Sequence, residues 1–471
     1  MILKTKPFAH QMDALNRFLT EPYGALFCEM GTGKTKISLD IMANGPEDGA
    51  LVAAPNGLHL NWMYSELPTH WPDEMDTAVY CWKGTPTTKK AKLLLADFMD
   101  SEARFKFFLI NVEALRTKSG FDPAKAFLKS RRSLHMVIDE STCIKNPKAA
   151  QTKACFKLGA LATRRWLLNG TPITQGPLDL FAQCKFLSPT ALPYASYTAF
   201  KSKFAVEVSQ TFGNRQFNKI VGYRHLEQLS AEVSPFSLRL TKEECLDLPD
   251  KVFKTRVIEA TPEQSKAYAE MKDLCLTELR EGAQVSVTNA LTKIIKLHQI
   301  LTGFVVDDEG TEHMIPNNRI PALVQDAEAA GSMVIFCAYV NNVKAVAAAL
   351  EEKFPNRVVT YYGDTKPDAR TAAVKAFQAG EVDFFVASSA AAKGITLHRT
   401  SELTYFSNPR SLETRLQSQD RIHRIGQDKK CTYTDLVIPN SLDEIIINTL
   451  KAKKDIADLV LDEIIDIIEE S

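Results

Sequence analysis

The chain has 471 residues, which at roughly 150 residues per domain predicts about three domains. It is 45% hydrophobic and 24% charged, and its 57 basic and 57 acidic residues give a formal net charge of zero. This balance excludes a wholly basic coat, although a local basic cleft is compatible with it. No apolar run reaches the ~20 residues of a membrane span, the N-terminus lacks a signal peptide, and the nine cysteines form no C-x-x-C pair. We therefore expect a soluble, intracellular, multi-domain protein with no membrane association and no structural zinc.

The first third of the chain alternates short apolar runs with amphipathic stretches. Strands are predicted at 24–28, 50–54, 78–82, 106–112, 134–139 and 165–169. Helices are predicted between them, at 34–43, 58–66, 88–99 and 148–159. Such alternation is typical of βαβ units, which build a parallel sheet with helices on both faces.

The middle of the chain, 186–315, has few strand-like runs and is predicted to be mostly helical. Its helices are expected at 222–232, 262–281 and 287–302, and a hairpin is compatible with 200–222. The alternation then resumes, with strands predicted at 333–338, 357–361, 383–387, 402–406 and 432–438. Helices are predicted at 341–353, 367–379 and 412–424, and one or two amphipathic helices at 441–471.

A glycine-rich segment, Gly31-Thr32-Gly33-Lys34-Thr35, lies between the first strand and the first helix. Glycines let backbone N–H groups turn toward phosphate oxygens, and the helix N-terminus adds a favourable dipole. The segment fits the G-x-x-x-x-G-K-[ST] phosphate loop, except that Cys28 replaces the first glycine. We expect Lys34 to contact the β- and γ-phosphates, with its side chain facing solvent until nucleotide binds, and Thr35 to ligate Mg²⁺.

An acidic pair, Asp139 and Glu140, ends the strand predicted at 134–139. Open parallel sheets bind their ligands at the carboxyl ends of the strands. We expect Asp139 to hold Mg²⁺, largely through water, and Glu140 to orient and polarise the attacking water. An Asp-Glu pair alone usually marks a helix start, but the preceding phosphate loop favours the catalytic interpretation.

Two arginines, Arg421 and Arg424, are three residues apart and are predicted to share one face of the helix 412–424. Two guanidinium groups suit a phosphoryl group whose charge must be neutralised as it leaves. The alternative is an ordinary basic helix face, in which the arginines pair only with local carboxylates such as Asp420 and Glu413.

Further segments carry a resemblance to one family. They are Pro7-Phe8-Ala9-His10-Gln11, Glu29-Met30 before the phosphate loop, Ala54-Pro55 with Asn61-Trp62, Asp139-Glu140 with Ile144-Lys145-Asn146-Pro147, Asn169-Gly170-Thr171-Pro172-Ile173, Leu238-Arg239-Leu240-Thr241-Lys242 with Leu248-Pro249, and the stretch from Arg421 to Gln427. With these motifs the chain resembles the superfamily-two helicase-type ATPases and, among them, the Swi/Snf-like chromatin-remodelling translocases in a compact form without appended domains.

The resemblance implies an α/β fold with two RecA-like lobes and a mostly helical insert between them. Lobe 1, the ATP-binding domain, is expected at 1–188, the insert at 189–315 and lobe 2, the helicase C-terminal domain, at 316–440. A C-terminal helix at 441–471 is expected to pack on a lobe. ATP is expected between the lobes, where the amide of Gln11 can present a donor and an acceptor to adenine.

The resemblance also implies the residues of the site. Nucleotide contacts are expected from Gln11, Gly31, Thr32, Gly33, Lys34, Thr35 and Gln417, metal contacts from Thr35 and Asp139, and catalysis from Lys34, Glu140, Arg421 and Arg424. Nucleic-acid contacts are expected at Lys145, Asn146, Gly170, Thr171, Gly363, Arg370, Ser388, Lys393 and Thr396. Such contacts to the phosphate backbone position a strand without reading its sequence.

Some positions depart from the family pattern. Ser141-Thr142 follows Asp139-Glu140 where the family has Ala-His, and that histidine normally links the water-activating carboxylate to the neighbouring motif. Asn169 replaces the first threonine of that neighbouring motif, T-G-T-P. Ala391-Ala392 replaces two glycines, and Ser389 replaces an arginine. The coupling between the motifs is therefore expected to be altered.

The expected function is that of a DNA-stimulated ATP hydrolase that moves along double-stranded DNA without sequence specificity and without separating the strands, using ATP and Mg²⁺. The alternatives are a strand-separating DNA or RNA helicase and the motor subunit of a multi-protein nuclease or restriction system. We expect a bacterial or viral protein that works in a cytoplasm rather than in a eukaryotic nucleus.

Overall fold

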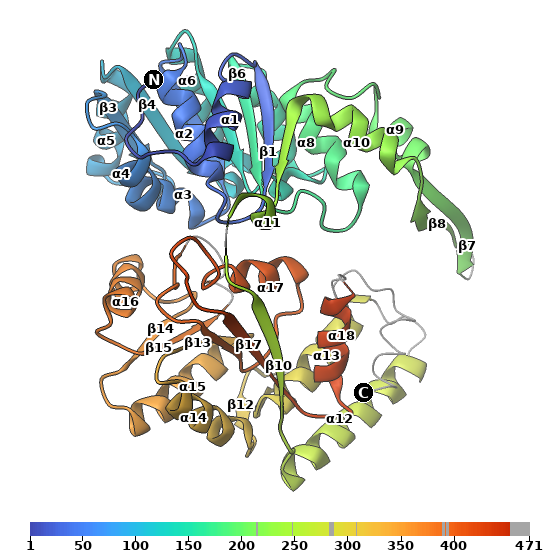
Figure 1. The fold of residues 1–471 in the computed structure, drawn as a ribbon. Helices are drawn as coiled ribbons and strands as arrows, with labels where there is room; N and C mark the ends of the chain where they lie inside the picture. Colours follow the sequence, from blue (N-terminus) through green and yellow to red (C-terminus); the bar gives the residue numbers. More distant parts are fainter. Residues whose placement is uncertain are drawn as a thin grey trace. The chain divides into compact units, whose positions relative to one another are not determined.

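The computed structural model (Figure 1) describes residues 1–212, 215–246, 248–281, 287–307, 309–388, 391 and 395–452. The chain forms two compact units, Met1–Asp247 and Leu248–Ser471, which we call unit 1 and unit 2. Each unit is built on one parallel sheet. The predicted fold class is confirmed by these two sheets.

The sheet of unit 1 has seven strands in the order β3-β4-β2-β5-β6-β1-β9, and every neighbouring pair is parallel. Its strands are β1 (Tyr23–Cys28), β2 (Gly49–Ala54), β3 (Thr77–Cys81), β4 (Phe105–Asn111), β5 (His135–Asp139), β6 (Arg164–Asn169) and β9 (Ser237–Leu240). All their carboxyl ends therefore lie along one edge. The six predicted strands of this region match β1 to β6 to within about one residue at each end.

The helices of unit 1 cover both faces of this sheet (Figure 1). They are α1 (Ala9–Phe18), α2 (Lys34–Asn44), α3 (Leu58–Asn61), the π-helix η1 (Trp62–Glu66), α4 (Leu67–His70), α5 (Lys89–Asp100), the 3-10 turn η2 (Val112–Arg116), α6 (Lys118–Ser130), the 3-10 turn η3 (Ser141–Ile144), α7 (Ala150–Gly159), the 3-10 turn η4 (Pro177–Asp179), α8 (Leu180–Leu187), α9 (Tyr197–Phe204), α10 (Leu226–Val233), the 3-10 turn η5 (Ser234–Phe236) and α11 (Lys242–Cys245). Because side chains alternate along a strand, Ala25 and Phe27 enter a core with α6, α7 and α8, whereas Leu26 and Cys28 enter another with α1, α2 and α4.

The stretch 186–315, which was predicted to have few strands, contains β7, β8, β9 and β10, besides two strands of three residues each. The antiparallel hairpin of β7 (Ala205–Phe212) and β8 (Arg215–Tyr223) extends from unit 1 (Figure 1), and β9 pairs with β1. The next strand, β10 (Lys251–Val257), pairs with β17 in the sheet of unit 2. The hairpin compatible with 200–222 is thus present, but the helix predicted at 222–232 begins only at Leu226, because β8 continues to Tyr223.

Unit 2 has six parallel strands in the order β10-β17-β16-β13-β15-β14. The other sheet strands are β13 (Met333–Cys337), β14 (Val358–Tyr361), β15 (Phe384–Ser388), β16 (Glu402–Tyr405) and β17 (Cys431–Val437), and a small antiparallel pair is formed by β11 (Phe304–Val306) and β12 (Glu312–Met314). The helices are α12 (Pro262–Glu281), α13 (Val287–Leu301), α14 (Arg319–Ala330), α15 (Val340–Lys353), α16 (Pro367–Ala379), α17 (Leu412–Gln419) and α18 (Leu442–Lys451).

The structure shows part of two helices that were predicted in unit 2. The helix predicted at 412–424 ends at Gln419, so Arg421 and Arg424 lie in the turns that follow α17. Of the helix predicted at 441–471, the structure gives α18; residues 453–471 lie outside the described residues. α18 packs on α13 in the core of unit 2.

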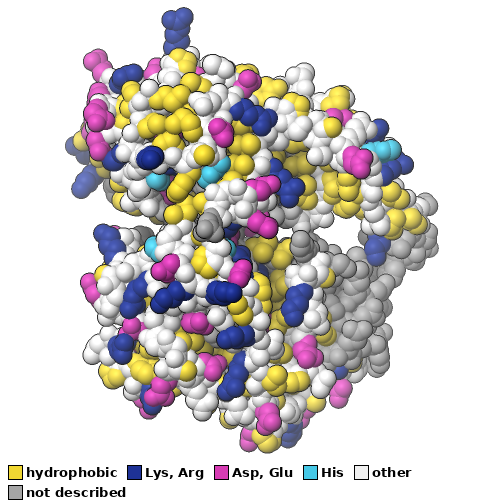
Figure 2. Space-filling model, viewed as in Figure 1, with side chains coloured by type: hydrophobic (Ala, Val, Ile, Leu, Met, Phe, Trp, Pro, Cys, Tyr) yellow, Lys and Arg dark blue, Asp and Glu magenta, His cyan; other side chains and the backbone are white. Residues whose placement is uncertain are grey.

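The visible surface carries both signs of charge on each unit (Figure 2), as the equal numbers of basic and acidic residues suggest. None of the helices in the described part of the chain combines the length and the apolar character that a membrane crossing requires.

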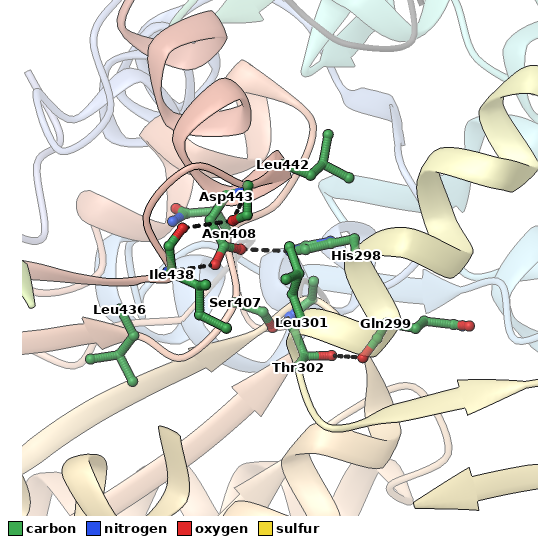
Figure 3. Close-up of polar contacts among 12 residues, drawn as sticks. His298, Gln299, Leu301, Thr302, Ser407, Asn408, Leu436, Ile438, Leu442 and Asp443 are labelled. Carbon is green, nitrogen blue, oxygen red and sulfur yellow. Dashed lines mark hydrogen bonds and ion pairs between the residues drawn. The ribbon is translucent and has the colours of Figure 1, made fainter. Parts of the chain in front are cut away.

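A buried ion pair joins several elements of unit 2. Arg319, with no exposed surface, pairs with Asp443 and donates hydrogen bonds to the carbonyl oxygens of Leu301, Phe406 and Leu436. Figure 3 shows Asp443 between Ile438 and His298. Burial and the positive charges of Arg410 and Arg319 hold the pKa of His298 well below its usual range, so the imidazole is neutral and Arg319 is the charged partner of Asp443.

We expect the substitution Arg319→Leu to destabilise unit 2 by about 3–5 kcal/mol, because it leaves a buried carboxylate without its cation. Thermal unfolding followed by circular dichroism should shift down by roughly 10 °C. The control is Arg357→Leu, which removes a half-exposed arginine paired with Asp383 and should cost less than about 1 kcal/mol. Equal shifts for the two variants would contradict the assignment.

Candidate nucleotide and nucleic-acid site

The glycine-rich segment connects β1 to α2 at the carboxyl edge of the sheet. Gly31 and Gly33 have φ angles of 86° and 91°, in the left-handed region that favours glycine. Between them Thr32 is fully buried, and its hydroxyl donates to the carbonyl of Glu29 at 2.8 Å. Thr35, the second residue of α2, is half-buried. The strand, turn and helix that a phosphate loop requires are therefore present.

The expectation that Lys34 faces solvent is wrong. Only 9% of Lys34 is exposed, and its Nζ donates to the carbonyl oxygens of Cys28, at 2.8 Å, and of Glu29, at 3.4 Å. The physical reason is that these carbonyls at the end of β1 lie within reach of the lysine and accept bonds from its ammonium group. A phosphate group bound in the loop would compete with them for Nζ.

Gln11 on α1 contacts the same loop. Its Nε2 donates to the carbonyl of Thr32 at 3.1 Å, and its Oε1 accepts from the N–H of Phe8. A Cβ added to Gly33 would lie 2.2 Å from this Nε2, so the amide packs directly on the loop. The structure thus brings Gln11 and the phosphate loop together; the role of Gln11 toward adenine remains a prediction.

The acidic pair ends β5 at the same edge. Asp139 is 6% exposed; its Oδ2 accepts from the indole Nε1 of Trp62 at 2.8 Å, and its Oδ1 accepts from the N–H of Glu140 at 2.9 Å. Glu140 has a left-handed backbone, with φ 50° and ψ 63°, which is uncommon for a residue with a side chain. The sequence marked Trp62 only as part of a family motif, but its N–H also orients the Asp139 carboxylate.

One residue beside the phosphate loop, Lys242, was named in the sequence only as part of a family motif and not as a site residue. β9 pairs with β1, with Leu240 opposite Cys28, and this pairing brings Lys242 beside the loop. A Cβ added to Gly31 would lie 3.5 Å from Lys242 Cε, and the N–H of Lys242 donates to Glu29 Oε2 at 2.9 Å. The signal was that motif, but the pairing of its short strand with β1 is a tertiary property.

The nucleic-acid residues predicted in unit 1 follow β5 and β6. Lys145 Nζ donates to Thr174 Oγ1 at 2.7 Å, the side chain of Asn146 accepts from the N–H of Lys148, and the N–H of Thr171 donates to Asn169 Oδ1 at 2.8 Å. A Cβ added to Gly170 would lie 3.3 Å from Cγ of Met30, which is next to the phosphate loop. These four residues therefore share the carboxyl edge with the nucleotide residues.

The two arginines of unit 2 converge although they are not on a helix. Nη1 of Arg421 and Nη1 of Arg424 both donate to the carbonyl of Ile395, at 2.8 and 3.2 Å. Arg424 also donates to Thr396 Oγ1 at 2.6 Å, which joins a predicted catalytic residue to a predicted nucleic-acid contact. Gln417, on α17, is buried; its Nε2 donates to Glu413 Oε1 at 2.8 Å, and no described group bonds its Oε1.

Three other residues of unit 2 were predicted to contact nucleic acid and lie in the described part of the chain. Arg370 on α16 donates to the carbonyl of Gly363 and lies over the ring of Tyr361. Ser388 is buried at the end of β15. Lys393 lies outside the described residues.

A parallel sheet with a phosphate loop after one strand and an acidic pair after another defines a nucleotide-binding α/β protein. Residues 11–303, well over half of the chain, match the SNF2-related domain, and residues 317–426 match the helicase conserved C-terminal domain. The chain therefore belongs to the SNF2-related family of helicase-type ATPases. The resemblance to Swi/Snf-like proteins is confirmed.

The relatives include eukaryotic and bacterial proteins. Nuclear protein STH1/NPS1 of Saccharomyces cerevisiae is 26% identical over 468 residues, which cover 92% of this chain and 33% of the yeast protein. An uncharacterized ATP-dependent helicase of Mycoplasma pneumoniae is 24% identical, over 95% of this chain and 41% of that protein. The solved SWI2/SNF2 ATPase core of Sulfolobus solfataricus in complex with dsDNA is 24% identical, covers 100% of this chain and 96% of that chain, and has a TM-score of 0.43.

Two facts follow from these relatives. The chain spans about a third of the length of the yeast protein and about two fifths of the mycoplasma protein. We expected a protein that works in a cytoplasm rather than in a nucleus. This expectation is wrong, because the relatives include a protein named as nuclear.

Proposed function

We propose that the chain is a DNA-stimulated ATP hydrolase that moves along double-stranded DNA without separating the strands. The observation that carries this proposal is the phosphate loop and the Asp139-Glu140 pair on one sheet edge, in a chain of the SNF2-related family. We keep the predicted division into lobe 1 (1–188), insert (189–315), lobe 2 (316–440) and C-terminal helix (441–471) as part of the proposal.

Lys34, with the backbone of Gly31 to Gly33, would hold the phosphates. Glu140 would orient the attacking water and accept its proton, and Arg421 and Arg424 would neutralise charge on the leaving phosphates. Thr35 and Asp139 would hold Mg²⁺, since hydroxyl and carboxylate oxygens suit this ion. Within the described residues no group of three His, Cys, Asp or Glu side chains forms a metal cage, and a Mg²⁺ bound with nucleotide does not need one. When bound, Mg²⁺ would neutralise charge on the phosphates.

The nucleic-acid proposal rests on hydroxyl, amide and basic groups at the carboxyl edges of the two sheets. Lys145, Thr171, Arg370 and Thr396 carry such groups and would contact backbone phosphates. Contacts of this kind give little sequence preference. Binding should therefore weaken steeply as salt is raised, because it releases counterions from the DNA.

We expect the protein, with ATP, to displace the third strand of a DNA triplex and to leave a forked duplex paired. A motor that follows the backbone of intact duplex would push off the third strand without opening the two beneath it. The measurement is the release of labelled third strand beside the unwinding of a labelled fork, at the same protein and salt concentrations.

The β7–β8 hairpin favours one alternative, a strand-separating helicase, because a hairpin can act as a wedge. Fork unwinding without triplex displacement would support that alternative and contradict the proposal. ATP hydrolysis stimulated by single-stranded DNA or RNA but not by duplex DNA would contradict it as well.

A further inference from the structure

Three buried side chains connect the loop after β5 with the loop after β6. The hydroxyl of Ser141 donates to Gln183 Oε1 at 2.5 Å and accepts from Asn169 Nδ2 at 3.2 Å. Ser141 and Gln183 have no exposed surface, and Asn169 has 1%. Ser141 and Asn169 are both positions where the chain departs from the family pattern, so the two departures contact each other.

The hydrogen bonds of this group fix the orientation of each amide. Gln183 Nε2 donates to the carbonyl oxygens of Pro172, at 2.8 Å, and Asp179, at 2.9 Å; a flipped amide would turn its oxygen toward both. Asn169 donates to Ser141 through Nδ2 and accepts from the N–H of Thr171 through Oδ1. Because these bonds engage both the oxygen and the nitrogen of each amide, neither amide can flip without losing hydrogen bonds, and the network resists being shifted at one point only.

One end of the network lies next to Glu140. The left-handed backbone of Glu140 is held on one side by the bond from its N–H to Asp139 Oδ1 and on the other by Ser141. Such a conformation persists only where its surroundings over-determine it. The direction of the Glu140 side chain is therefore set in part by where the Ser141 hydroxyl is anchored.

The other end holds the loop that follows β6. Thr171 is held by Asn169, and Pro172 is held by Gln183. Further along the same loop, the backbone and side chain of Thr174 donate to Asp179 Oδ2, while Lys145 donates to the Thr174 hydroxyl. A ligand that moves Thr171 or Lys145 must therefore move Asn169, Gln183 or Asp179.

We propose that Ser141, Asn169 and Gln183 are positioning residues that transmit DNA binding at Lys145 and Thr171 to Glu140, and so replace the link that the family makes through the histidine after its acidic pair. This inference rests on the proposed function. The inference assigns a role in DNA stimulation to Gln183, on α8, which is neither a predicted nucleotide contact nor a predicted nucleic-acid contact.

The test is Gln183→Leu in the full chain, which keeps the size of the side chain and removes its three hydrogen bonds. We expect unchanged DNA affinity and a DNA-stimulated turnover reduced about 5- to 100-fold, with a smaller loss in the DNA-free rate of ATP hydrolysis. Asn169→Ala should have a similar effect, and the double variant should be no worse than the single ones, because both substitutions break one connection.

The matched control is Gln264→Leu in unit 2. Gln264 is equally buried and donates to two carbonyl oxygens, those of Ile300 and Leu301, both at 2.9 Å. This variant should lower the melting temperature and leave the ratio of stimulated to DNA-free turnover unchanged.

Stimulation of folded Gln183→Leu equal to that of the wild type would overturn the inference and leave the proposed function intact. The inference would also fail if the DNA-free and stimulated rates fell by the same factor, since that is the effect of general damage. A wild-type protein that hydrolyses ATP without any response to duplex DNA would overturn the proposed function, and this inference with it.

Discussion

Replacing Lys34 with alanine is expected to lower DNA-stimulated ATP hydrolysis by roughly 10²–10³-fold, the cost of removing one preorganised charge from a developing transition state. The lysine is positioned for this role by the turn at Gly31 and Gly33 and by α2. Its ammonium is held by the carbonyl oxygens of Cys28 and Glu29, so no large movement is needed to reach a phosphate in the same loop. The measurement is steady-state phosphate release with saturating duplex DNA.

Lys34→Ala also removes two buried hydrogen bonds from a charged donor, at a cost to folding of about 1–3 kcal/mol. The control is therefore Lys106→Ala. Lys106 is 2% exposed and donates to the carbonyl oxygens of Met99 and Ser101, both at 2.8 Å, on β4 and away from the carboxyl edge. It should destabilise unit 1 by a similar amount and keep its turnover per folded molecule. Normal turnover in folded Lys34→Ala would refute the site assignment.

The local parts of the site could be predicted from the sequence. The phosphate loop needs only a strand, two glycines and a helix in immediate succession, and the acidic pair needs only a buried strand that ends at Asp139. The predicted strands 24–28 and 134–139 agree with β1 and β5 to within about a residue, because continuous apolar runs between polar turns define buried parallel strands well.

The parts that depend on which segments meet could not be predicted. Ser237–Leu240 is only four residues long, and nothing in those residues indicates that they pair with β1. The position of Lys242 beside Gly31 follows from that pairing alone. In the same way, Gln183 has no neighbour in sequence that marks it; its contact with Ser141 arises because α8 packs beneath the end of β6.

The end of α17 shows a tertiary contact overriding helical periodicity. The sequence predicts a helix over 412–424, but Arg421 Nε donates to the carbonyl of Gln417, and the carbonyl of Arg421 accepts from the N–H of Leu397. The arginines still converge, through the carbonyl of Ile395 rather than through a shared helix face.

Arg424→Ala is expected to keep ATP binding and DNA binding and to lose DNA-stimulated hydrolysis by on the order of 10³-fold, the contribution that an arginine makes on a transferred phosphoryl group. Arg421→Ala should act likewise, with a larger loss of stability, because Arg421 is 6% exposed and its Nε also donates to the carbonyl of Gln417 at 2.8 Å. Arg424→Lys should rescue poorly, since lysine lacks the planar fork.

The alternative, in which the arginines pair only with local carboxylates, is tested by the same variants. Asp420 lies 3.6 Å from Lys251 Nζ, and Glu413 accepts from Gln417, while Arg424 donates to Ile395 and Thr396. The matched control is Arg399→Ala, an arginine of unit 2 that donates to the carbonyl of Val382 at 2.7 Å and pairs with Asp383. It should lower stability and keep DNA stimulation.

The bond between Arg424 and Thr396 gives the DNA response its expected form. A backbone phosphate that accepted a hydrogen bond from the Thr396 hydroxyl would hold that hydroxyl while it accepts from Arg424 Nη1, so bound DNA would fix the position of this arginine. Because Arg424 would act on charge that develops as the phosphoryl group leaves, DNA should raise turnover more than it raises ATP affinity. The test is to measure turnover and ATP affinity with and without duplex DNA, together with the melting temperature of each variant. These values separate a role of Arg424 in DNA stimulation from a role in stability. Retained stimulation in folded Arg424→Ala would assign this arginine a purely structural role.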